Sequence, residues 1–174
     1  MTASTEIQKA FMDINWRNIK PIDPYPTLKH PFNKKIYLKE TPMYKLSDRS
    51  LNRLEGVKPI LIQILQKAIV SSPYDFGIPQ SGGYRSAADQ FILFKKGASK
   101  CDGYKNKSYH QSGNAFDIYI YENGRANWDV HKLQAVAYHI QEIAWMEFDL
   151  VIEWGGDWVS WKDYPHFQIK EKTL

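Results

Sequence analysis

The stretch Ser108-Tyr-His-Gln-Ser-Gly-Asn-Ala-Phe-Asp117 joins a polar loop to an apolar run that ends at Tyr121. Two of its side chains can bind a metal ion: His110 and Asp117, which lie seven residues apart. Gly113 lies between them and lets the loop fold back, so that both side chains can reach one ion. Alone, such a pair is weak evidence, because many pairs of His and Asp are surface residues.

A second polar cluster near the end of the chain, Asp163-Tyr-Pro-His-Phe-Gln168, supplies a further histidine. The chain contains five histidines, and two of them lie in short motifs that also carry an acid. Catalytic zinc sites use three protein ligands, such as neutral imidazole and ionised carboxylate, and leave a fourth position open. His110, Asp117 and His166 would form such a site, with Asp163 three residues before the last ligand.

The apolar run Ala115–Tyr121 has the alternation of a half-buried strand. Phe116, Ile118 and Ile120 fall on one face, and Asp117 falls on the other. We therefore predict one strand over this run, with its apolar face in the core and Asp117 facing the metal.

Hydrophobic spacing predicts the other elements. The pair Ser47 and Asp48 is typical of a helix start. Further helices are predicted over residues 59–70, 86–96 and 129–146, and further strands over 76–79, 148–153 and 166–170. Because helices and strands do not alternate regularly, we predict an α+β fold with a small, mainly antiparallel sheet and helices packed on one side.

The first part of the chain differs in composition from the rest. Five of the nine prolines lie between Pro21 and Pro42. Proline removes a backbone donor and disfavours a helix before it, so residues 1–45 are predicted to form an extended arm packed on the domain. The remaining residues, 46–174, are long enough for one domain with a sizeable core.

Charge and cysteine content narrow the expected partners. The net charge of +4 is spread along the chain, so it favours approach to an anionic polymer but does not indicate nucleic-acid binding. Cys101 is the single cysteine, which excludes an intramolecular disulfide. No apolar run reaches membrane-spanning length, and the first residues lack the basic start and apolar segment of a secretory signal. We expect a monomer without stable membrane association.

Both polar motifs are also typical of one enzyme family. Ser108-x-His110-x-x-Gly113-x-Ala115-x-Asp117, combined with Asp163-x-x-His166, resembles the zinc-dependent peptidases that include D-Ala-D-Ala carboxypeptidases and phage L-alanyl-D-glutamate endopeptidases. Flanking segments are similar to the endolysin branch of that family: Gly83–Ser86, Gln90, Gly97–Cys101 and Glu153–Trp158. The resemblance covers roughly residues 46–170.

The resemblance implies a role for each motif residue. His110, Asp117 and His166 would hold Zn2+ in a fold like that of the hedgehog domain and the D-Ala-D-Ala peptidases. Asp163 would be the general base that takes a proton from the attacking water. Arg85 would bind a substrate carboxylate or stabilise the oxyanion. Both residues could instead have structural roles: Asp163 would cap a turn, and Arg85 would pair with a surface carboxylate.

Five further residues are expected near the site. Glu153 would be either a partner of a ligand histidine or the base itself. Ser108 is expected to donate or accept a hydrogen bond and to contact substrate, because no histidine-activated serine pattern surrounds it. Trp154 is also expected to contact substrate, although at least one of Trp154, Trp158 and Trp161 is expected to lie in the core.

The function that the resemblance implies is hydrolysis of peptidoglycan stem peptides by a phage endolysin, first of all at the L-Ala–D-Glu bond. Two alternatives stay open at this point: a D-Ala-D-Ala carboxypeptidase of the same fold, and a non-catalytic, zinc-containing module that binds the wall. An endolysin without a signal peptide is expected in the host cytoplasm until lysis, and then at the periplasm and cell wall.

Overall fold

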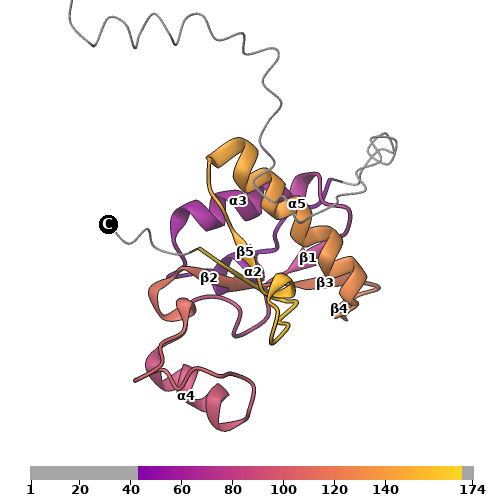
Figure 1. Ribbon diagram of the computed structural model, residues 1–174. Helices are drawn as coiled ribbons and strands as arrows, with labels where there is room; N and C mark the ends of the chain where they lie inside the picture. The colour runs from indigo at the N-terminus through magenta and orange to yellow at the C-terminus, as the bar shows by residue number, and fades with distance from the viewer. Residues whose placement is uncertain (1–42, 170–174) are drawn as a thin grey trace, which may run out of the picture. The chain divides into compact units, whose positions relative to one another are not determined.

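The structure is a computed structural model that describes residues 43–169 (Figure 1). Residues 1–42 and 170–174 lie outside the described residues. The arm expected over residues 1–45 falls almost wholly among the former, so both the arm and the domain boundary stay predictions.

Helices form where the sequence supplies a start signal and an apolar face. Among the described residues these α-helices are α2 (Asp48–Arg53), α3 (Pro59–Val70), α4 (Ala87–Lys95) and α5 (Val130–Phe148). Ser47, Ser86 and Asp129 each accept a hydrogen bond from a backbone N–H of the first turn. The predicted helix over residues 59–70 is confirmed. None of the helices in this part of the chain is both long and apolar enough to cross a bilayer.

The strands form two short, antiparallel sheets. One has the order β1-β3-β4 and the other the order β2-β6-β5. Their bounds are β1 Phe76–Gly77, β2 Ala115–Asp117, β3 Tyr119–Glu122, β4 Arg125–Asn127, β5 Glu153–Trp154 and β6 His166–Gln168. The predicted α+β class with a small, mainly antiparallel sheet is confirmed, although the sheet is divided in two.

The run Ala115–Tyr121 is two strands, so the prediction of one strand was wrong. The chain changes sheets at Ile118, whose N–H donates to the carbonyl of Pro165 at 3.0 Å. Alternation of apolar residues continues across the break, because Phe116 and Ile118 are both fully buried. Periodicity therefore shows which side chains face the core but does not show where a strand changes partner.

The predicted strand over residues 148–153 is also much shorter in the structure. Helix α5 continues to Phe148 and ends at Asp149, which has a left-handed φ of 50°. Residues 150–152 form no strand, and β5 begins at Glu153. An aspartate can adopt the left-handed conformation that commonly ends a helix, although it is rarer there than glycine.

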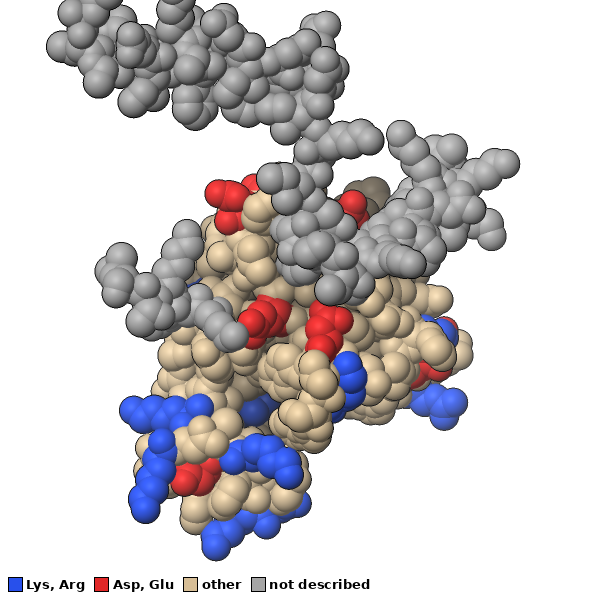
Figure 2. Space-filling view, viewed as in Figure 1, with Lys and Arg blue, Asp and Glu red and all other residues tan. Residues whose placement is uncertain are grey.

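Helix α4 lies apart from α3 and α5, at the lower end of the domain in Figure 1. Gln90 is the buried residue of this helix, and most of its other side chains are exposed. Lys and Arg side chains gather over this end of the domain, whereas Asp and Glu are more frequent at the opposite end (Figure 2).

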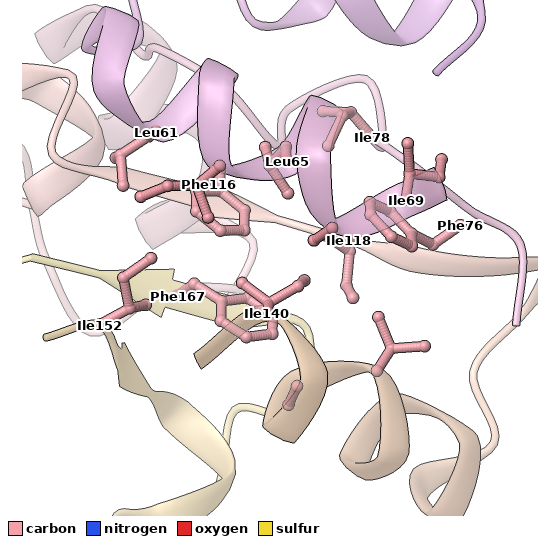
Figure 3. Close-up of a cluster of buried hydrophobic side chains, with 14 of the residues drawn as sticks. Leu61, Leu65, Ile69, Phe76, Ile78, Phe116, Ile118, Ile140, Ile152 and Phe167 are labelled. Carbon is pink, nitrogen blue, oxygen red and sulfur yellow. The ribbon is translucent and has the colours of Figure 1, made fainter. Parts of the chain in front are cut away.

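The hydrophobic core lies where α3, α5 and the strands converge (Figure 3). Leu61 and Leu65 enter it from α3 and Ile140 enters from α5. Phe116 of β2 stacks on Phe167 of β6, with ring centroids 5.0 Å apart. This stacked pair lies beside Asp117 and His166 in the sequence, so core packing sets the position of both polar residues.

Candidate metal centre and active site

Two cross-strand pairs of the β2-β6-β5 sheet carry polar residues of the site. Asp117 lies directly opposite His166, and Glu153 lies directly opposite Gln168. His166 and Gln168 are two residues apart on β6, so their side chains project from the same face. The register of the sheet thus brings together residues from three separate stretches of sequence.

His110 comes from η2 (Tyr109–Ser112), a short 3-10 turn just before β2. The Ser108 hydroxyl accepts a hydrogen bond from the His110 N–H at 3.4 Å, while the Gln111 side chain accepts one from the Ser108 N–H at 2.9 Å. This reciprocal capping fixes the start of the turn. Gly113 ends it with a left-handed φ of 68°.

The three predicted ligands meet at one point. Nε2 of His110 lies 3.2 Å from Nδ1 of His166 and 3.3 Å from Oδ1 of Asp117. Nδ1 of His166 lies 3.0 Å from the same Oδ1. Among the described residues, these three form the one group of His, Cys, Asp and Glu side chains that could hold a metal ion.

The other ring nitrogen of His110 determines its tautomer. Nδ1 lies 2.7 Å from the carbonyl oxygen of Gly83. A carbonyl oxygen can only accept, so Nδ1 carries the proton and donates it. In the neutral ring, Nε2 therefore points a lone pair toward Asp117 and His166.

The tautomer of His166 is also determined by a hydrogen bond, but in this ring the proton lies on Nε2 and not on Nδ1. Nε2 lies 3.1 Å from Oε1 of Gln168, whose own amide group donates to Oε2 of Glu153 at 2.9 Å. Gln168 thus offers an acceptor to His166, so Nε2 carries the proton. Nδ1 of His166 is left with a lone pair that faces His110.

These donor atoms fit a zinc ion. With ligand atoms about 2.0–2.1 Å from a tetrahedral ion, the ligand atoms are about 3.3–3.4 Å from one another. The separations of 3.0–3.3 Å between His110, Asp117 and His166 come close to this value. Two imidazole lone pairs and a carboxylate oxygen face one point without a proton between them, and a cation at that point would satisfy all three.

Arg85 lies against the predicted metal ligands. One of its terminal nitrogens donates to Oδ2 of Asp117, the carboxylate oxygen that faces away from the two histidines. Nε donates to the carbonyl of Ser81 at 2.6 Å, and Nη1 donates to Oε1 of Gln90 at 3.3 Å. Each of the three guanidinium nitrogens therefore makes a hydrogen bond within the protein. Contact between Arg85 and substrate stays a prediction, whereas the contact in the structure is with Asp117.

A cleft of about 460 Å³ opens over the three ligands. Asp163, the predicted base, lines it, and so do Ser108 and Arg85. Burial raises the pKa of the Asp163 carboxyl above its ordinary value, and the nearby charge of Asp117 raises it further. The structure thus brings the predicted base and the predicted ligands to one cavity.

The tryptophans divide between cleft and core. Trp158 and Trp161 line the cleft together with Trp128. Trp154 is 1% exposed and packs against Tyr138 and Tyr164. Its indole N–H donates to the Tyr164 carbonyl at 2.7 Å. The structure therefore places Trp154 in the core rather than in contact with substrate, because β5 turns this side chain inward.

Comparison with protein families settles the class of enzyme. The model of the family described as phage L-alanyl-D-glutamate peptidase matches residues 43–174. The chain belongs to this family. The predicted peptidase class and its phage branch agree with that membership.

Individual relatives of this peptidase are named for the same activity as the family. It is 34% identical to the L-alanyl-D-glutamate peptidase of Escherichia phage T5, over 75% of this chain and 92% of the relative. It is 32% identical to the peptidoglycan L-alanyl-D-glutamate endopeptidase CwlK of Bacillus subtilis, over 50% of this chain and 57% of that relative. The crystal structure of the Serratia marcescens L-Ala D-Glu endopeptidase ChiX superimposes with a TM-score of 0.64 and 29% identity, covering 76% of this chain and 95% of ChiX.

The charges in the peptidase site suit a cation. Burial works to raise the pKa of Asp117, but His110 and His166 outweigh it and hold that pKa well below its ordinary value. Burial lowers the pKa of His166, whereas the hydrogen bond and charge of Asp117 raise it to a net value above the ordinary one. Asp117 is therefore ionised and ready to serve as an anionic ligand.

Three features of the site were not predicted from the sequence. Gln168 orients His166, the carbonyl of Gly83 orients His110, and Trp128 lines the cleft. The position of Gln168, two residues after His166 on a predicted strand, is a signal that could have identified it. The Gly83 carbonyl and Trp128 reach the site through the fold, and no local motif marks them.

Proposed function

We propose that this peptidase uses a zinc ion to hydrolyse the L-Ala–D-Glu bond in the stem peptides of peptidoglycan. One observation carries the metal assignment: Nε2 of His110, Nδ1 of His166 and Oδ1 of Asp117 converge at separations of 3.0–3.3 Å, and in the neutral tautomers their lone pairs face one point. Family membership and the activities for which the relatives are named support the choice of scissile bond.

Zinc would be held by Nε2 of His110, Oδ1 of Asp117 and Nδ1 of His166. When bound, it lowers the pKa of water to about 7 and polarises a peptide carbonyl. Arg85 keeps Oδ2 of Asp117 occupied, so that Oδ1 is directed at the site. The protein ligands are thus oriented before substrate enters.

Asp163 would move the proton. Its carboxylate accepts a proton from the attacking water and passes it to the departing nitrogen of the glutamyl residue. The bond between the alanyl carbonyl carbon and that nitrogen breaks, leaving a new carboxylate and a new amino group. A carboxyl whose pKa is raised by burial is a stronger base than an exposed one, which suits this role.

We also propose that the peptidase acts as a monomer, makes no stable membrane contact, and stays in the host cytoplasm until lysis admits it to the wall. The phage description of the family supports this order of events. Gel filtration tests the first point. For the others, the protein would be produced in bacteria: cells should stay intact and the protein should fractionate with the cytoplasm until the inner membrane is permeabilised.

Metal analysis combined with a digest of defined muropeptides tests the main proposal. We expect one zinc per chain and products with a new N-terminal glutamate, identified by mass spectrometry. Asp163→Asn should keep its zinc and lose activity by at least about 10²-fold. Asp157→Asn is the matched control, because Asp157 is exposed and does not line the cleft; it should keep both zinc and activity.

Two results would replace the proposal. Release of free D-alanine from the same muropeptides would identify a carboxypeptidase. If Asp163→Asn degraded sacculi like the wild type, and chelation lowered the melting temperature without slowing degradation, zinc would be structural and Asp163 would not be the base.

A further inference from the structure

Residues 87–107, which comprise α4 and the loop after it, differ in charge from the rest of the domain, and we name them the lysine lobe. The described residues 43–169 contain 14 basic and 14 acidic side chains, so they carry no net formal charge. The lysine lobe has two acids, Asp89 and Asp102, against five bases. Those bases are Lys95, Lys96, Lys100, Lys105 and Lys107.

The five lysines are exposed, and none forms an ion pair with another described residue. Two lie over aromatic rings instead: Lys95 is 5.3 Å from the ring centre of Phe91, and Lys100 is 5.9 Å from that of Trp161. Figure 2 shows the resulting positive surface around α4. Because these lysines form no ion pair with a described residue, they are available to an anionic partner.

The lobe is joined firmly to the metal centre. The amide of Gln90, which is fully buried, donates to Oγ of Ser99 at 2.7 Å and to the Cys101 carbonyl at 3.0 Å. The same side chain accepts from Arg85, the residue that holds Asp117. The segment that carries the lysines therefore has a defined position relative to the metal ligands.

The positive surface also continues into the cleft. Lys100 and Lys107 line the cavity that holds His110, Asp163 and His166. Arg85 lines it too, but its nitrogens are engaged by Asp117 and its neighbours. The two lysines are thus the cations of the cleft wall that remain available to substrate.

We propose that the lysine lobe is a docking surface for peptidoglycan itself, which binds the carboxylates of stem peptides around the one being cut. This inference rests on the proposed function, because a substrate that contains glutamate carries carboxylate groups. Multiple weak ionic contacts with a polymer of repeated carboxylates would raise the rate of encounter and lower KM. The effect on the chemical step itself would be small.

The observations favour the wall polymer over a lipid surface. The exposed rings of the lobe pack on one another: Phe91 lies 6.3 Å from Phe94 and 5.8 Å from Tyr104, measured between centroids. They are therefore not arranged as separate anchors for insertion into a bilayer. In addition, a flat membrane could not follow the charged surface into the cleft, whereas a peptide chain could.

Binding to purified sacculi tests the inference. All proteins would carry Asp163→Asn to prevent digestion. Replacing Lys95, Lys96 and Lys105, which do not line the cleft, by Gln should weaken binding at low salt by about tenfold and reduce its dependence on salt. The same three changes to Arg should restore binding. A matched control, with Lys45, Arg49 and Arg125 changed to Gln, removes three exposed charges from other elements and should bind like its parent.

Each contrary result has a distinct meaning. Equal weakening in the control would show that net charge acts without a docking surface, and unchanged binding in the Gln variant would exclude the lobe. If the Gln variant lost binding to phosphatidylglycerol vesicles but not to sacculi, the partner would be a membrane. The proposed function is judged separately, from the muropeptide products of the wild-type protein, so either idea can fail without the other.

Discussion

Gln168 accepts a hydrogen bond from Nε2 of His166 at 3.1 Å, from a position two residues further along the same strand. This contact fixes which nitrogen of His166 faces the metal site. Gln168→Leu, which has a similar size but no acceptor, should weaken zinc binding about 10–100-fold. Gln168→Glu retains the acceptor and should bind more tightly than the Leu variant. Zinc affinity would be measured by competition with a chromophoric chelator.

The role of Glu153 can be tested by comparing Glu153→Gln with the Gln168 variants. Its carboxylate accepts from the Gln168 amide at 2.9 Å and so holds that amide with its oxygen toward His166. Glu153→Gln should therefore weaken zinc binding less than Gln168→Leu does, because it acts one step further away. If Glu153→Gln abolished activity with full zinc content, Glu153 rather than Asp163 would be the base.

Gly113 is a point where backbone shape decides whether His110 can reach the site. It has a left-handed φ of 68°, and an added Cβ would lie 2.4 Å from the Gly56 carbonyl oxygen. Gly113→Ala should cost about 2–4 kcal/mol of stability, from strain together with the clash. Gly97 has a similar φ of 71° but no atom within 4 Å of an added Cβ. Gly97→Ala should therefore cost about 1–2 kcal/mol.

Urea unfolding of the two alanine variants makes this comparison directly. The difference between them isolates the contact with Gly56, since the backbone conformation is shared. Similar losses for both would mean that the loop at Gly113 moves away from Gly56 without cost. Gly113→Ala should also lower the affinity for zinc, because Gly113 follows directly on the turn that carries His110.

His139 should make stability depend on pH at a place remote from the catalytic cleft. It is 5% exposed on α5, and its Nε2–H donates to the Ala68 carbonyl at 3.0 Å. Nδ1 is buried with no hydrogen-bond partner among the described residues. Burial lowers the pKa of this histidine, although the Ala68 contact and Glu142 oppose that effect. Protonation would place a charge on Nδ1 without an acceptor.

The sign of the effect follows from that lowered pKa. Below the ordinary histidine pKa of about 6.5, His139 binds a proton in the unfolded chain, whereas in the folded chain it stays neutral until the pH is lower. The stability that neutral His139 contributes is thus complete above about pH 6.5 and is lost as the pH falls through the folded-state value. His139→Gln should lose less stability than the wild type between pH 7.5 and pH 5 in urea unfolding. Parallel losses would assign the pH dependence to other groups.

Local motifs were sufficient to identify His110, Asp117 and His166, which the structure brings together. Contacts between distant segments have no such local signature in the sequence. His110 and Asp117 share one short stretch, and its turn residues Ser108 and Gly113 have physical signatures in sequence. The change of sheet at Ile118 has no such signature in the sequence, because it depends on which strands are available as partners. The same holds for Arg85, since its contact with Asp117 joins residues that are far apart in the chain.

The contact between Arg85 and Asp117 leads to the last prediction. If Arg85 positions the carboxylate, Arg85→Gln should weaken zinc binding, and excess zinc should restore much of the activity. If Arg85 instead binds a substrate carboxylate, the variant should keep its zinc and show a raised KM that zinc does not correct. Arg85→Lys separates the role of the positive charge from that of the guanidinium shape, because lysine keeps the charge but cannot reach Asp117, Ser81 and Gln90 at the same time.

We expect Arg85→Lys to resemble Arg85→Gln in zinc affinity, since the three contacts depend on the planar guanidinium group. Wild-type zinc affinity in both variants would rule out the positioning role.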